Sequence, residues 1–274
     1  MASQQESYLL ASGTPEMERL RLQARVWEPE AEAMLARMSL PPRAACVDLG
    51  CGAMGILGPL SHKVGMEGRV LGIDVDPVQL EAARAYVNEL GASNVEIIEG
   101  DAYQTDLPDE SFDLVHTRFV FAPVGRDDEL LDEMVRLTRP GGVIAIQEPD
   151  SSSWNCFPSH PAWDRLKEAI LAAFRGGGGD FNAGRRTYQM LCSMGINEVQ
   201  IRAAIMALPP RHPYRRLPVQ FVTSLRPRIL NLGLLTEAEL DEAVAECEQI
   251  VADTNTIVLT FALIQTWGIK PPVS

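Results

Sequence analysis

The chain has 274 residues, of which 46% are hydrophobic and 22% are charged, and its formal net charge is −13. This balance is typical of a folded globular protein, and the negative charge argues against nucleic acid, because phosphate backbones are bound by surplus Lys and Arg. The N-terminus lacks a signal-peptide pattern, and no stretch reaches the roughly 20 apolar residues that span a bilayer. We therefore expect a cytoplasmic protein with no membrane span.

The five cysteines and four histidines are scattered along the chain. They form no Cys-x-x-Cys pair and no His-Glu-x-x-His pattern, which are common arrangements of metal ligands. The sequence therefore predicts neither a disulfide framework nor a metal site.

The pattern of residues 1–43 predicts two helices, over 16–25 and 30–38. These helices could form a lid over a functional site. Short β-branched segments then alternate with helical periodicity, which predicts a doubly wound, mostly parallel α/β sheet. A helix is expected between Asp76, a good N-cap, and Gly91, and others over residues 128–138 and after Pro161. The first five strands are expected at residues 45–49, 69–74, 95–99, 112–116 and 143–148.

The sixth and seventh strands are expected at residues 198–207 and 256–267. Between them, residues 208–255 are expected to be mostly helical, because Thr236 and Glu239 have the spacing of a capping box. This insert is predicted to form a cap over one end of a catalytic domain that covers residues 44–274. The four glycines at 176–179 favour a mobile loop over a phosphate cradle, since no strand precedes them.

A glycine-rich segment, Asp48-Leu49-Gly50-Cys51-Gly52-Ala53-Met54-Gly55, follows the first expected strand directly. Its glycines also fit Gly-x-Gly-x-x-Gly, a weak signal of a dinucleotide site. Asp48 distinguishes a site for NAD from a site for S-adenosylmethionine. A carboxylate at this position would repel the pyrophosphate of NAD but attract the ammonium of S-adenosylmethionine. The charge favours a cationic ligand.

Two more carboxylates end the next two strands. Asp74 is placed to accept hydrogen bonds from ribose hydroxyls, and Asp101 offers an acceptor to an adenine amino group beside the small Ala102. Three acidic residues at the ends of three consecutive strands are a stronger signal than any one of them alone.

With these motifs, residues 44–148 resemble the class I S-adenosylmethionine-dependent methyltransferases, particularly the small-molecule branch of ubiquinone and menaquinone biosynthesis. The resemblance also rests on Phe112-Asp113-Leu114-Val115 and Leu137-Thr138-Arg139-Pro140-Gly141-Gly142. It implies a Rossmann-like fold of seven strands with the last one antiparallel. It further implies a cofactor site made of Asp48, Gly50, Cys51, Gly52, Asp74, Val75, Gln79, Asp101, Ala102, Thr117 and Arg118. One departure is the third glycine, Gly55, which in the family usually stands one position earlier, at the place of Met54.

The expected function is methyl transfer to an O, N or C atom of a small molecule, with quinones and secondary metabolites among the compatible acceptors. Where an acceptor must lose a proton, the candidate bases are His116, His160 and Glu148, at or beyond strand ends. Tyr8 and Trp27 are candidate lid residues, and the arginines between 202 and 228 a candidate patch for an acidic group.

Several alternatives stay open at this point. The glycine spacing and Asp74 also fit an NAD-dependent oxidoreductase, which would leave Asp48 and Asp101 unexplained. A non-catalytic S-adenosylmethionine-binding protein, an additional activity such as a cyclisation, and a homo-oligomer built through the N-terminal helices are likewise compatible with the sequence.

Overall fold

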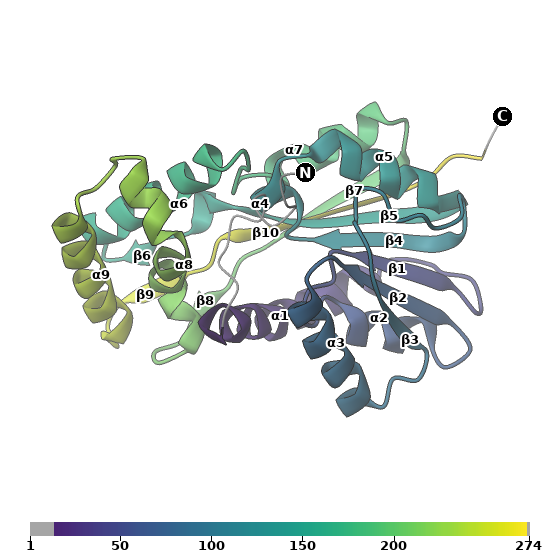
Figure 1. Ribbon diagram of the computed structural model, residues 1–274, viewed down its shortest axis with the longest axis horizontal. Coiled ribbons are helices and arrows are strands. Elements are labelled where there is room, and N and C mark those ends of the chain that lie inside the picture. The colour runs from purple at the N-terminus through teal and green to yellow at the C-terminus, as the bar shows by residue number, and fades with distance from the viewer. Residues whose placement is uncertain (1–13, 273–274) are drawn as a thin grey trace.

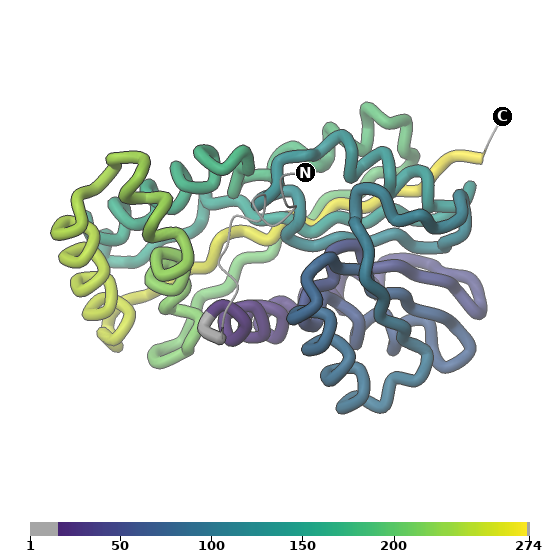
Figure 2. Tube along the Cα trace, in the orientation of Figure 1, coloured from purple at the N-terminus to yellow at the C-terminus, as the bar shows by residue number. Residues whose placement is uncertain are grey.

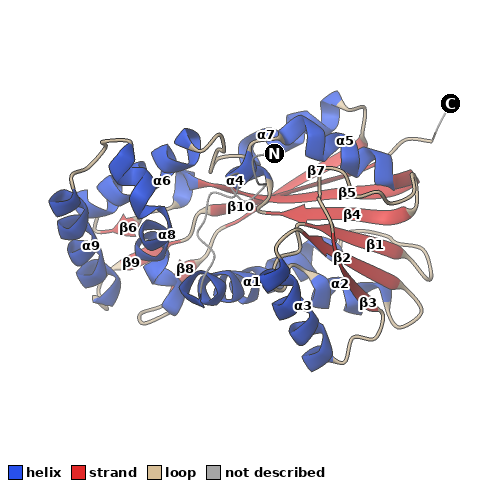
Figure 3. Ribbon diagram, in the orientation of Figure 1, coloured by secondary structure: helices blue, strands red, loops and turns tan. Residues whose placement is uncertain are grey.

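The computed structural model describes residues 14–272, and its centre is a seven-stranded sheet in the order β3-β2-β1-β4-β5-β10-β7 (Figure 1). All neighbouring strands pair in parallel except β10, which is antiparallel to both β5 and β7. Helices cover both faces of the sheet (Figure 3). The predicted doubly wound fold with an antiparallel last strand is therefore confirmed.

The first three strands, β1 (Ala45–Leu49), β2 (Arg69–Asp74) and β3 (Val95–Glu99), have the predicted bounds. The next two, β4 (Phe112–Arg118) and β5 (Thr138–Asp150), are longer than predicted, because pairing with neighbouring strands extends them beyond their apolar centres. On the far side of β5 lie β10 (Ala262–Ile269) and the edge strand β7 (Asn197–Ala204).

A second, three-stranded sheet was not predicted. It consists of β6 (Cys156–Phe157), β9 (Ile257–Leu259) and β8 (Ala207–Leu208). The predicted strand at 256–267 is thus divided into β9 and β10, and the one at 198–207 into β7 and the start of β8. The break follows from tertiary pairing, since the amide of Thr260 donates to the carbonyl of Met206 and its hydroxyl accepts from the Met206 amide.

On one face of the main sheet lie α1 (Thr14–Leu35), α2 (Leu57–Val64) and α3 (Pro77–Leu90), and on the other lie α5 (Asp127–Leu137) and α7 (Gly184–Ser193). The prediction of two leading helices was wrong, because α1 continues through Pro29 as a single helix. Packing stabilises it on both sides of the proline, since Trp27 and Ala31 are fully buried. As predicted, α3 begins after Asp76, whose carboxylate accepts from two helix amides, and ends at Gly91.

The helices outside the sheet gather beyond the carboxyl ends of β4 and β5 (Figure 2). They are α4 (Phe121–Val124), α6 (Pro161–Gly176), α8 (Leu217–Asn231) and α9 (Glu237–Ala252), with the short turns η2 (Ser151–Ser153) and η3 (Pro213–Arg216). The predicted capping box at Thr236 and Glu239 begins α9. No helix within residues 14–272 is long and apolar enough to cross a membrane, and no group of three or more potential metal ligands occurs in that range.

Close packing against α4 explains why a glycine is needed at the end of the four-glycine run. A Cβ on Gly179 would lie 2.3 Å from the carbonyl oxygen of Ala122, so only glycine lets the loop lie against α4. The amide of Asp180 then donates to the same carbonyl at 2.8 Å. The loop is therefore tied to the element that follows β4.

Candidate active site

The glycine loop follows β1 and turns back onto the start of α2. Gly50 has a φ of +67°, and a Cβ on it would come within 2.5 Å of Cγ2 of Val120. The amide of Gly52 donates to Asp74 at 2.8 Å. Burial, together with the charges of Asp48 and Asp74, raises the pKa of the Cys51 thiol well above its usual value, which does not favour the thiolate that a nucleophile needs.

Asp74 ends β2 and joins the glycine loop to α3. Its two oxygens accept from the amides of Gly52 and Asp76, at 2.8 and 2.9 Å. Burial raises its pKa, although these two amides act in the opposite direction. Each carboxylate oxygen has a second lone pair, so Asp74 can still accept from a ligand. Of the two neighbours predicted with it, Val75 is exposed, whereas Gln79 is buried beside Gly52.

Asp101 and Ala102 follow β3, as predicted. One oxygen of Asp101 accepts from the amide of Tyr103 at 2.9 Å, and Ala102 is buried in the main core. The first three strands are adjacent and parallel, so the loop after β1 and the acidic residues after β2 and β3 lie at one edge of the sheet. The structure thus brings the predicted cofactor residues of three strands together.

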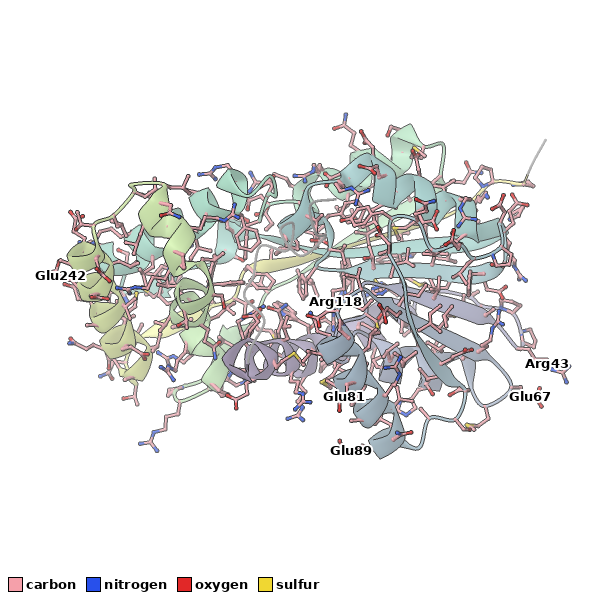
Figure 4. The ribbon with its side chains drawn as sticks, viewed as in Figure 1. Arg43, Glu67, Glu81, Glu89, Arg118 and Glu242 are labelled. Carbon is pink, nitrogen blue, oxygen red and sulfur yellow. The ribbon has the colours of Figure 1, made fainter. Side chains whose placement is uncertain are left out.

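Thr117 and Arg118 end β4 beside this edge. The hydroxyl of Thr117 donates to the carbonyl of Leu49 at 2.9 Å, and Nη2 of Arg118 donates to the carbonyl of Gly55 at 2.5 Å. Figure 4 places Arg118 near the centre of the molecule, where α1 meets α3. Its side chain is buried, which lowers its pKa, and its Nη1 is buried without a hydrogen-bond partner. A buried guanidinium with an unused donor is suited to an anionic group of a ligand.

The three candidate bases have other partners. His116 is fully buried, with Nδ1 2.7 Å from Asp48 and Nε2 2.9 Å from Gln147. Glu148 is also fully buried and accepts from the amides of Val120, Phe121 and Ala122. His160 caps α6 through the amide of Ala162, among the helices beyond the sheet. None of the three lines the cavity described next.

A small aromatic cavity lies beyond the carboxyl ends of β4 and β5. Its walls come from α1, α4, α6 and α8, from the end of β5, and from the segments around residues 119, 181 and 261. They comprise Arg19, Leu20, Gln23, Phe119, Ala122, Pro123, Pro149, Phe174, Phe181, Phe221 and Phe261. Trp154 stacks on Phe181 behind this wall, with ring centroids 5.3 Å apart. The polar side of the cavity is already paired, because Arg19 binds Glu16 and Gln23 and lies 4.7 Å from the centroid of the Phe221 ring.

The segment after β4 joins the glycine loop to the cavity, which sequence reasoning did not foresee. Phe119, at a φ of +62°, lines the cavity, while the next residue, Val120, touches Gly50. A left-handed backbone at a bulky residue is costly, and such strain is typical of functional sites. No sequence signal distinguishes Phe119 from an ordinary core aromatic.

Two other candidate features have structural partners. Trp27 is fully buried and donates to the hydroxyl of Tyr214 at 3.0 Å, while Tyr8 lies outside the described residues. Among the arginines between 202 and 228, Arg202, Arg216 and Arg226 each pair with a glutamate. Arg215 instead donates to the backbone carbonyls of Asp253 and Thr256.

Comparison with known proteins identifies the same region. Residues 42–176 match a family model described as a methyltransferase domain. A demethylmenaquinone methyltransferase of Geobacillus stearothermophilus is 34% identical over 115 residues, which are 42% of this chain and 49% of that protein. The match thus spans about half the length of that relative.

Solved structures agree on the fold. The YcgJ protein of Bacillus subtilis superposes with a TM-score of 0.57 at 18% identity, over 89% of this chain and 100% of that one. A geranyl diphosphate methyltransferase superposes with a TM-score of 0.52 at 18% identity, over 88% and 76% of the two chains. Residues 42–176, just under half of the chain, are therefore similar to a methyltransferase domain.

Proposed function

We propose that this chain transfers a methyl group from S-adenosylmethionine to an O, N or C atom of a small, largely apolar molecule. The observation that carries the proposal is the junction after β4. Val120 touches the glycine loop at Gly50, and Phe119 lines the aromatic cavity. A ligand on the loop and a second ligand in the cavity would therefore border the same two-residue segment, and transfer requires the acceptor atom to reach within roughly 3 to 3.5 Å of the methyl group, with no residue between them.

The residues at the sheet edge fit the cofactor. Gly50 leaves the backbone accessible, Asp74 has free lone pairs for ribose hydroxyls, and Asp101 offers an acceptor for adenine. The unused Nη1 of Arg118 suits the one carboxylate that the cofactor carries. Asp48, Cys51, Gly52, Val75, Gln79, Ala102 and Thr117 complete the proposed site. When bound, S-adenosylmethionine supplies an electrophilic methyl group on a sulfonium.

We further propose that the protein acts by positioning the acceptor and excluding water rather than through a general base. His116, His160 and Glu148 are each engaged elsewhere, and the cavity wall within residues 14–272 contains neither a carboxylate nor an imidazole. The roles of lid for residues 1–43 and of cap for residues 208–255 belong to this proposal, because α1 and α8 both line the cavity. A cytoplasmic enzyme without a nucleic-acid partner remains our expectation.

The aromatic wall favours an acceptor with an unsaturated or planar apolar part. Phe119, Phe181 and Phe221 present ring faces and edges, which bind such groups through dispersion and quadrupole contacts. The names of two similar proteins, which refer to demethylmenaquinone and geranyl diphosphate, point in the same direction. The comparisons give no support to the oxidoreductase alternative.

The direct test is calorimetric titration of the purified chain with S-adenosylhomocysteine and, separately, with NAD. We expect binding of the first only, and its loss in Asp74→Ala. Asp132→Ala, which removes an exposed carboxylate of α5, serves as the matched control and should bind normally. Binding of NAD alone would overturn the proposal. Binding of the nucleoside without methyl transfer to any of a panel of quinones, phenols and isoprenoids would favour the non-catalytic alternative.

A further inference from the structure

A ladder of buried polar side chains crosses the main sheet on the face that α1 covers. It runs from β1 through β4, β5 and β10 to the edge strand β7. We define this polar ladder as Asp48, His116, Gln147, Gln265 and Arg202, with Glu30 of α1 at its outer end. The three middle side chains are fully buried. Sequence patterns singled out Asp48 and His116 but not Gln147 or Gln265, because the members of the ladder are far apart along the chain.

Each step is a direct contact between hydrogen-bonding groups of two side chains. Nη1 of Arg202 lies 2.5 Å from Oε1 of Gln265, and Nε2 of Gln265 lies 2.8 Å from Oε1 of Gln147. Nε2 of Gln265 also donates to the backbone carbonyl of Glu30 at 2.9 Å. Nε2 of Gln147 then lies 2.9 Å from Nε2 of His116.

The outer end fixes the direction of every bond. A guanidinium has no acceptor and a carbonyl oxygen has no donor. Gln265 must therefore turn its oxygen toward Arg202 and its amino group toward Glu30. The same amino group faces Gln147, so Gln147 must present its oxygen there and its own amino group to His116. Flipping either amide would place two donors or two acceptors face to face.

This direction determines the tautomer of His116. Its Nε2 accepts from Gln147, so a neutral ring carries its proton on Nδ1 and donates it to Oδ1 of Asp48, 2.7 Å away. The other oxygen of Asp48 accepts from the amide of Ile56 at 3.0 Å, at the end of the glycine loop. Both oxygens of Asp48 are thereby held in place.

We propose that Gln147 and Gln265 are positioning residues for the cofactor, which hold His116 as its Nδ1–H tautomer and thereby orient Asp48 against the glycine loop. The inference rests on the proposed cofactor site. It assigns His116 a donor role rather than the role of a base, and it links α1 through Glu30 to the carboxylate expected to face the cofactor's ammonium. Because Nδ1–H of His116 already fixes the Asp48 side chain, that side chain loses less conformational entropy when the ligand binds.

The first experiment uses the wild-type chain. Nitrogen-15 spectra of the histidine rings at neutral pH should show His116 with a protonated Nδ1 and an unprotonated Nε2, the resonances being assigned by their absence from His116→Asn. A protonated Nε2 would overturn the inference, whatever the affinity for the cofactor.

The second experiment measures S-adenosylhomocysteine affinity in paired variants. His116→Asn keeps an amide donor near the position of Nδ1 and should bind within about threefold of wild type. His116→Gln places the amide near Nε2 instead. This variant and the single variant Gln147→Leu should each weaken binding about tenfold, as expected for an unsatisfied buried group. The control is Thr266→Val, which removes a 2.7 Å bond to Thr187 from the opposite face of β10 and should leave affinity unchanged.

The outcomes separate the two proposals. If the wild type does not bind S-adenosylhomocysteine, the proposed function fails. If the wild type binds and the Asn and Gln variants of His116 bind equally, the positioning inference fails while the function stands. Thermal unfolding of every variant checks that the loss of affinity does not come from a loss of folded protein.

Discussion

Glu148→Gln is expected to change how the stability of the protein depends on pH. Glu148 is fully buried at the end of β5, where burial raises its pKa from the ordinary 4.5 to about 8. The amides of Phe121, Ala122 and Val120 act against this shift without cancelling it. The folded protein therefore keeps a proton on Glu148 over a range in which the unfolded chain has released it.

The sign and size of the effect follow from proton linkage. Between about pH 4.5 and 8 the folded state binds more protons than the unfolded state, so the free energy of unfolding falls as pH rises. One fully retained proton corresponds to about 1.4 kcal/mol per pH unit. From pH 5.5 to 7.5, the wild type should thus lose up to about 2 to 3 kcal/mol relative to Glu148→Gln, whose amide does not titrate.

Urea unfolding of both proteins at pH 5.5, 6.5 and 7.5 provides the measurement. Glu133→Gln is the matched control, because burial acts to raise the pKa of Glu133 but hydrogen bonds from Arg136 and Thr105 lower it overall. Its contribution to stability is lost only at more acidic pH, so its difference from wild type should stay constant over this range. A constant difference for Glu148→Gln as well would refute the reasoning.

Two further substitutions test the cofactor site. Gly55→Ala should weaken S-adenosylhomocysteine binding more than Gly65→Ala, because both glycines have positive φ but only the Cβ at Gly55 would meet Asp48, at 2.2 Å; equal binding of the two variants would argue against a role for Asp48. Arg118→Met should weaken S-adenosylhomocysteine binding about tenfold and leave 5′-methylthioadenosine, which lacks the carboxylate, unaffected, as titration of both ligands would show. Loss of both ligands would mean that Arg118 supports the loop generally.

The departure at Gly55 has a physical explanation in the structure. The family usually has its third glycine one position earlier, but here Asp48 lies directly against Gly55. Any side chain at Gly55 would displace the carboxylate that His116 and Ile56 hold. The first two glycines keep their predicted places, so the shift affects the exit from the loop rather than its entry.

Local sequence determined the first half of the fold. β1, β2 and β3 and the helix capped by Asp76 could be placed to the residue, because strand patterning, caps and glycine stops act over a few neighbouring positions. The glycine loop, Asp74 and Asp101 could be located for the same reason, since each lies at or just beyond the end of a predicted strand. Where an element depends on distant partners, the prediction was less accurate, as with α1 across Pro29 and the strand divided at Thr260.

Only the tertiary structure decided how the candidate groups are used. His116 and Glu148 stand at strand ends like plausible bases, but their partners come from β1, β5 and the backbone of α4, at separations that no periodicity reveals. The aromatic cavity draws its walls from α1, α4, α6 and α8. Side-chain type and strand position are properties of the sequence, whereas burial and hydrogen-bond direction arise when segments far apart in the chain pack together.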